Sequence, residues 1–207
     1  MNKTINIQHI TKYTLLLLTL SFSTLIQSCG SGASSSVSSI MGGGESTLLS
    51  DAKQLKEAQE ELMKMPKYEG KDVQVFQNIQ FFTVAGGKII IELQDPSKPE
   101  NIDHYEYMNG KWSDASPVQI SGEGDMKDNL TPLKEIDFTT VEKINNVWST
   151  KAKTVEGAEK KPLDLVIYNF IVESNDKFWI TSDIEGSREK YSATFNKDGS
   201  LREYIKK

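Results

Sequence analysis

Cysteine and histidine are nearly absent from this 207-residue chain. Cys29 is its only cysteine, so no internal disulfide can form. Beyond the first 28 residues the chain has one histidine, His104. A Ser-His-Asp triad needs a histidine that a carboxylate orients, but the neighbouring Asp103 points to the opposite face of a strand. A zinc site built from His and Cys needs several such ligands, and His104 is the one available. We therefore expect neither kind of chemistry.

Positive charge is also scarce. The chain has 24 Lys and Arg against 29 Asp and Glu, and two of the lysines lie in the first 28 residues. The remainder, with 22 basic and 29 acidic residues, carries a net charge of −7. Only Arg188 and Arg202 are arginines, the residues best suited to bidentate binding of phosphate or carboxylate. We therefore expect no nucleic-acid partner. From the lack of His and Cys ligands we expect no metal, and no motif of the chain indicates a cofactor.

No apolar run reaches the roughly 20 residues that a membrane-spanning helix needs. The longest, Leu15–Leu20, follows a segment that carries Lys3 and Lys12 and no acid. This order is typical of a secretory signal peptide, which we place at residues 1–28. The segment closes in Leu-Ile-Gln-Ser-Cys-Gly over residues 25–30.

That closing segment resembles the lipobox of bacterial lipoproteins, although Gln27 is bulkier and more polar than the usual small residue. The resemblance implies that Cys29 receives diacylglycerol and becomes the new N-terminus, held in the membrane by its acyl chains. In Gram-negative lipoproteins an aspartate after the cysteine favours the inner membrane. Gly30 stands there, which implies the outer membrane, at the periplasmic face or the cell surface. The alternative is an ordinary signal peptide cut near Ser28, which leaves a free thiol.

Serine and glycine dominate the next segment, which includes Gly42-Gly43-Gly44. Such a composition buries too little apolar surface to fold, so residues 29–47 are predicted to form a lipidated flexible tether. Its reach would be roughly 20–25 Å.

The rest of the chain shows a duplication with an offset of 89 residues. Phe82–Ile91 matches Ile171–Ile180 in pattern, and the turn at Asn109-Gly110 falls on Asp198-Gly199. Each copy opens with an amphipathic helix, 50–65 or 139–155, the second with a Thr139/Glu142 capping box. Four strands follow each helix: 73–84, 88–93, 102–108 and 111–120, then 163–173, 177–182, 190–196 and 201–206.

This pattern predicts an α+β fold of two tandem α-β4 repeats, each a helix packed on a four-stranded antiparallel sheet. The first repeat would cover residues 48–120 and the second 138–207, with an acidic linker at 121–137. A tandem pair of this kind resembles β-lactamase-inhibitor-like proteins and PepSY-like periplasmic domains. The resemblance lies in the order of elements and carries no binding residues across. It leaves open whether the repeats form one sheet or two.

Aromatic residues give one positive signal for a site. Tyr105 and Tyr107 share one face of a strand, and Trp112 follows across a turn. Such a cluster would stack on sugars or anchor a protein partner. The alternative is cross-strand packing beneath the helix.

These features favour a non-enzymatic, membrane-anchored envelope lipoprotein that acts as a protein-interaction or assembly module, with another envelope protein as its partner. The alternative is a carrier that holds a hydrophobic or glycan ligand between sheet and helix, in a cavity of several hundred Å³. A third hypothesis is an envelope hydrolase with two carboxylates roughly 5–9.5 Å apart in a cleft. The sequence leaves the oligomeric state open.

Overall fold

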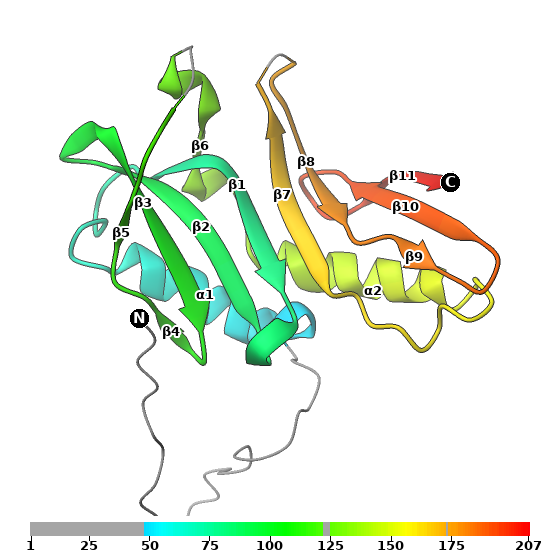
Figure 1. The fold of residues 1–207 in the computed structure, drawn as a ribbon. Helices are drawn as coiled ribbons and strands as arrows, with labels where there is room; N and C mark the ends of the chain where they lie inside the picture. Colours follow the sequence, from blue (N-terminus) through cyan, green and yellow to red (C-terminus); the bar gives the residue numbers. More distant parts are fainter. Residues whose placement is uncertain (1–47, 122–124, 173) are drawn as a thin grey trace, which may run out of the picture. The chain divides into compact units, whose positions relative to one another are not determined.

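A computed structural model describes residues 48–121, 125–172 and 174–207, and the predicted signal peptide, Cys29 and tether lie outside them. The described chain contains two α-helices, α1 (Ala52–Met63) and α2 (Thr140–Ala152), and a sheet whose strand pairs are all antiparallel (Figure 1). The predicted α+β class is confirmed.

The described residues contribute eleven strands to one sheet. The strands are β1 (Gln74–Phe82), β2 (Lys88–Asp95), β3 (Lys98–Met108), β4 (Lys111–Trp112), β5 (Ser116–Val118), β6 (Leu130–Pro132), β7 (Leu165–Ile171), β8 (Asp176–Thr181), β9 (Ile184–Glu185), β10 (Lys190–Phe195) and β11 (Leu201–Lys206). Eight of them run in the order β11-β10-β8-β7-β1-β2-β3-β4, and β5, β6 and β9 pair with β3, β1 and β10. Short 3₁₀ helices occupy Leu48–Ser50, Val84–Gly86, Met126–Asn129 and Leu133–Glu135.

The sequence left open whether the repeats form one sheet or two, and the described strands form one, so neither helix has a separate four-stranded sheet of its own. β1 pairs with β7, so that Ile79 lies opposite Tyr168 and Phe81 opposite Val166. All four side chains are buried. Two separate sheets would leave the backbone edges of β1 and β7 unpaired in the middle of an apolar layer, and pairing them removes that cost.

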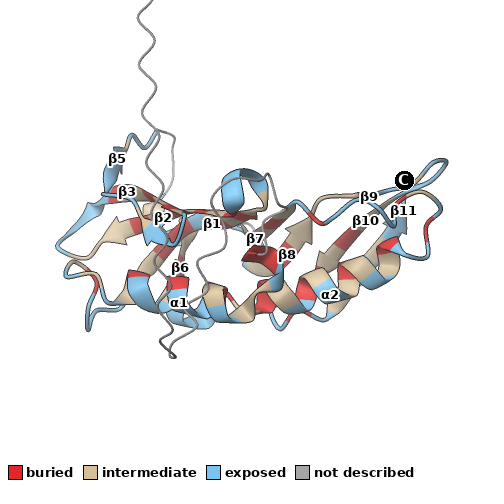
Figure 2. Ribbon diagram, turned by 90° about the horizontal axis from the view of Figure 1, so that it is seen from below, coloured by how far each residue is buried: buried red, intermediate tan, exposed pale blue. Residues whose placement is uncertain are grey.

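Both helices cover the same face of this sheet (Figure 2). Leu55, Ala58 and Leu62 of α1 have no exposed surface, and Ile144 and Trp148 of α2 are buried in the same core cluster. These positions follow the helical period that the sequence predicts. Burial of each large side chain contributes about 1.5–3 kcal/mol. The described residues thus form two layers, with the helices on one side of the sheet and, on the other, a sheet surface that neither helix covers.

The two helices begin differently. Asp51 caps α1, because its side chain accepts a hydrogen bond of 3.0 Å from the Gln54 amide. The predicted Thr139/Glu142 capping box does not form, since Thr139 already has helical backbone angles and its side chain makes no capping bond. Asp137 accepts instead from the Thr139 amide at 2.9 Å and from its hydroxyl at 2.7 Å.

Some predicted strand boundaries also change. The single strand expected at 111–120 is split into β4 and β5 by residues 113–115. Residues 121–137 contain β6, which pairs with β1, and the buried Leu133 and Ile136. The constant offset of 89 fails in one hairpin. It matches Ile89, which is fully buried, with the partly exposed Phe178, while Trp179 is the buried residue of β8. A slip of one residue reverses the face of every side chain in a strand.

Candidate protein-interaction surface

The uncovered sheet face can be read from the alternation of buried and partly exposed residues. Ile89 and Ile91, for example, are buried beneath the helices, and Ile90 between them is partly exposed. Cross-strand pairing then defines a row across seven strands. It runs through Glu106, Ile90, Gln80, Ile167, Ile180, Thr194 and Glu203. We call the surface that carries this row the open face.

The centre of the open face is apolar. Ile167 lies opposite Ile180, and in the adjacent row Phe82 lies opposite Leu165. Together with Ile90, these residues are only partly buried. Seven strands spaced about 4.8 Å apart span roughly 29 Å, a width comparable with one side of a standard protein interface.

Charged groups flank this apolar centre on the β2–β3 side. Lys88 Nζ lies 2.6 Å from the Glu106 carboxylate, and His104 lies 3.5 Å from the same carboxylate and 3.7 Å from that of Glu92. The hydrogen bond from Lys88 holds the pKa of Glu106 below its usual range, against the opposing effect of partial burial. His104 therefore lies between two carboxylates on the open face, beside the Lys88–Glu106 ion pair.

A second charged group flanks the centre on the β8–β11 side. The Arg202 guanidinium binds both carboxylate oxygens of Asp176, at 3.0 and 2.8 Å, and stacks 4.8 Å from the ring centre of Phe178. The hydrogen bond from Arg202 lowers the pKa of Asp176. An apolar centre with a polar rim is the anatomy of many protein-binding surfaces.

The three aromatic residues that the sequence singled out do not lie on the open face. Tyr105 and Tyr107 are 4% and 3% exposed within the core beneath α1. The Tyr105 hydroxyl accepts a hydrogen bond of 3.0 Å from Tyr68. Trp112 packs 5.3 Å from the Tyr107 ring and donates from Nε1 to the Ala58 carbonyl of α1 at 2.8 Å. The structure thus brings the three residues together as packing beneath the helix, the alternative that the sequence left open.

Lys67 ties the turn after α1 to the far end of β2 and β3. Its ammonium lies 2.8 Å from the Asp95 carboxylate and also binds Asp103. Burial would lower its pKa, but the two carboxylates outweigh that effect and raise it to about 12. Burial also raises the pKa of the adjacent Tyr68 hydroxyl. Because the two carboxylates keep Lys67 protonated, Lys67 is not available as a general base. The cluster instead links the turn after α1 to β2 and β3.

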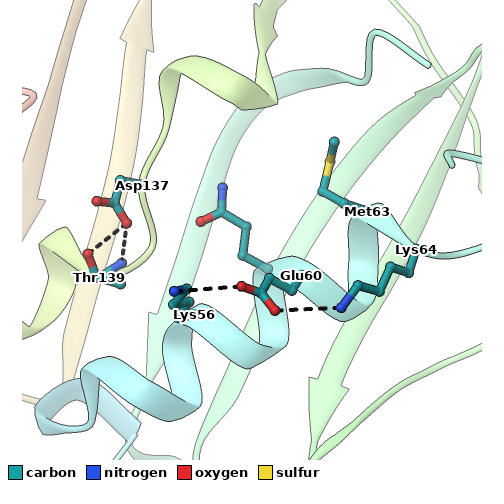
Figure 3. A pocket seen from close by; sticks show the side chains of 7 residues that line it. Lys56, Glu60, Met63, Lys64, Asp137 and Thr139 are labelled. Atoms are coloured by element: carbon teal, nitrogen blue, oxygen red, sulfur yellow. Dashed lines mark hydrogen bonds and ion pairs between the residues drawn. The ribbon is translucent and has the colours of Figure 1, made fainter. Parts of the chain in front are cut away.

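A surface groove of about 550 Å³ lies between α1 and the start of α2 (Figure 3). It is lined by Lys56, Gln59, Glu60, Met63, Lys64, Asp137 and Thr139. Glu60 pairs with Lys56 at 3.8 Å and with Lys64 at 3.6 Å, and Asp137 is engaged by Thr139. The groove therefore lies beside the helices, whereas the layer between helix and sheet is filled by the core cluster.

The hydrolase hypothesis needs a pair of carboxylates in a cleft, and a second hollow of about 440 Å³, beside Trp148, is lined by Asp183 and Glu185. Lys190 lies 3.1 Å from Asp183 and 2.7 Å from Glu185. Burial would raise the pKa of Asp183, but hydrogen bonds from Lys207 and Lys190 lower it, and Lys190 lowers that of Glu185. A glycosidase general acid needs a raised pKa, so this pair has the opposite electrostatics.

Among residues 48–121, 125–172 and 174–207, no group of three or more His, Cys, Asp or Glu side chains is arranged to hold a metal ion. Within the same ranges, no helix is long and apolar enough to span a membrane. Comparison with protein-family models, curated proteins and solved structures finds no match.

Sequence reasoning missed the open face as a set of residues. The alternation in each strand indicated one covered and one wet side, but Gln80 and Ile167 become neighbours only through the β1–β7 pairing. The available signal was the run Ile89-Ile90-Ile91, in which consecutive apolar residues place isoleucine on both faces of one strand.

Proposed function

We propose that this chain is a membrane-anchored envelope lipoprotein without enzymatic activity, which binds another envelope protein through its open face. The observation that carries the proposal is the apolar centre of Phe82, Leu165, Ile167 and Ile180 between two flanks that each contain an ion pair. A partner that buries the apolar centre of such a surface gains binding free energy, and the ion pairs at the rim can stay as they are. A broad, open sheet suits a protein partner better than a small molecule.

We further propose that the described chain is a tandem pair of α-β4 units fused through β1 and β7. Corresponding turns follow the two helices. The amides of Tyr68 and Lys71 bond the carbonyls three residues earlier, and those of Ala158 and Lys161 do the same 90 residues later. In each half a helix is followed by strands that pair in sequence, β1-β2-β3-β4 and β7-β8-β10-β11. This order supports the likeness to β-lactamase-inhibitor-like and PepSY-like architectures.

The proposed anchor is the lipidated Cys29. Outer-membrane attachment is proposed because Gly30, and not an aspartate, follows this cysteine. Replacement of the acceptor, Cys29→Ala, is expected to release the protein from the membrane fraction. Mass spectrometry of the N-terminal peptide of the native protein is expected to show the mass of a diacylated cysteine. An unmodified Cys29 on a membrane-free protein would refute the anchor and leave the open-face proposal to its own test.

The partner is tested by native pull-down with quantitative mass spectrometry. Ile167→Arg places a charge at the apolar centre and is expected to deplete a stoichiometric envelope protein at least tenfold. Ile120→Arg is the matched control, because Ile120 is an exposed apolar residue outside the sheet. Equal recovery from both variants, or no stoichiometric partner for the parent chain, would overturn the proposal.

The groove between the helices supports a second candidate function, a carrier of a hydrophobic or glycan ligand. Its volume of about 550 Å³ falls in the range of small-molecule sites. The test is extraction of the natively purified protein and analysis of the extract for a stoichiometric small molecule. Met63→Lys would abolish its recovery if the groove holds it.

A further inference from the structure

The two edges of the sheet differ in their capacity to accept another strand. At one edge, β4 and β5 contain two and three residues, and β5 includes Pro117, which has no amide to donate. At the other edge, β11 pairs only with β10 within the described residues. Beyond a bulge at its start, β11 is regular, and the Lys207 amide extends the ladder with a 2.8 Å bond to Lys190. The β11 edge is therefore open.

The backbone of β11 presents a defined set of unpaired groups. The Lys207 amide points toward β10, where it bonds Lys190. In an antiparallel ladder every second residue does the same, so the amides and carbonyls of Glu203 and Ile205 also point toward β10. The amides and carbonyls of Tyr204 and Lys206, at alternate positions, point away from β10 and have no strand partner within the described chain. Ile205, the central residue of the regular stretch 203–207, is 53% exposed.

We propose that β11 pairs with β11 of a second copy of this chain, antiparallel about a two-fold axis at Ile205. The outward-pointing backbone groups of the two strands must face each other, and they occur at every second residue. A two-fold axis must therefore pass through a residue, and we compare axes at residues 203, 204 and 205. An axis at 203 sets two copies of Glu203 opposite each other, and an axis at 204 sets the apolar Ile205 against the charged Glu203. Like charges in directly opposed positions are unfavourable. An axis at 205 sets Glu203 against Lys207 and brings the two isoleucines together.

Self-pairing of this kind gives an isologous, closed dimer. Glu203 and Ile205 lie on the open face, because Thr194 and Ser192 opposite them do. The open faces of both copies thus join into one surface, and the exposed Ile205 side chains are covered. The pairing and its register are argued from β11 alone, whereas the concentration of the chains at a membrane rests on the proposed lipid anchor. The paired strands bury less than a standard interface, so membrane attachment, which concentrates the chains, favours the dimer.

Disulfide trapping in intact membranes tests the register. The full chain carries Ile205→Cys, Tyr204→Cys or Glu203→Cys, and the parent chain, whose only thiol would be Cys29, reports background dimers. At the axis, the two residues 205 form a non-hydrogen-bonded pair with Cα atoms about 4.5 Å apart, within disulfide range. Two copies of residue 203 stand about 13 Å apart along the strand, out of reach.

The expected result is a disulfide-linked dimer of Ile205→Cys at least five times as abundant as that of Glu203→Cys or Tyr204→Cys. Maleimide labelling of each thiol first shows that it is accessible, so a missing dimer means a missing partner strand. A dimer strongest at residue 203 or 204 refutes the register. Dimer levels no higher than those of the parent at all three sites refute self-pairing.

Discussion

Gln59 joins the helix of the first half to the chain that enters the second. Its side-chain amide donates to the Ile136 carbonyl at 2.6 Å, and its carbonyl accepts from the Phe138 amide at 3.0 Å. Both backbone partners belong to buried residues. Gln59→Ala removes both bonds and leaves a donor and an acceptor unsatisfied.

Each unsatisfied buried group costs about 1–3 kcal/mol, but the groove beside Gln59 admits water, so we take the low end for each. The expected loss in the free energy of unfolding is about 2 kcal/mol. The assay is urea unfolding of the detergent-solubilised full chain, with the midpoint read by tryptophan fluorescence. Lys56→Ala, at an exposed position one turn earlier on α1, is the control and is expected to change the free energy by less than about 0.5 kcal/mol.

A loss below about 0.5 kcal/mol for Gln59→Ala would refute the reasoning, because the two bonds would then contribute nothing beyond solvation. Two separate unfolding transitions in the variant would instead show that the halves become uncoupled when this link is lost.

Three further predictions follow from the same packing. The pKa of Asp95 is lowered by Lys67, so its stabilising effect is present above about pH 4 and is lost as the pH falls through the folded-state pKa; urea titrations from pH 2 to 5 should show this loss, and a weaker pH dependence in Lys67→Gln. Trp112→Phe keeps the ring but loses the bond to the Ala58 carbonyl, so unfolding experiments should find a loss of about 1 kcal/mol. Gly199→Ala should lower the melting temperature in calorimetry by several degrees, because φ is +84° and a Cβ would lie 3.0 Å from a methyl group of α2.

Local patterns predicted the elements well. The buried stripes at Leu55 and Ile144 follow the helical period, and they pack as expected. Turn residues also gave the hairpins, since Asn109 and Gly110 adopt the positive φ values that such turns require. These features depend on a few neighbouring residues, so the sequence contains them in full.

Long-range pairing was beyond these patterns. Period-two alternation placed Tyr105 and Tyr107 on one face, but it cannot say whether a helix covers that face. The β1–β7 junction joins residues almost ninety positions apart, and no local signal specifies it. The short β6 ends in Pro132, which weakens its strand signal. The open face depends on all of these pairings and could not be assembled from the sequence.

The central claim is that a protein partner covers the open face, and site-specific photo-cross-linking in living cells tests it most directly. A photoreactive residue at Ile180 lies at the apolar centre, and one at Lys53 lies on the outer side of α1, where the side chain is 84% exposed. We predict a discrete heterologous adduct from position 180 and none of that mass from position 53. The same adducts from both positions, or none from position 180, would contradict the account.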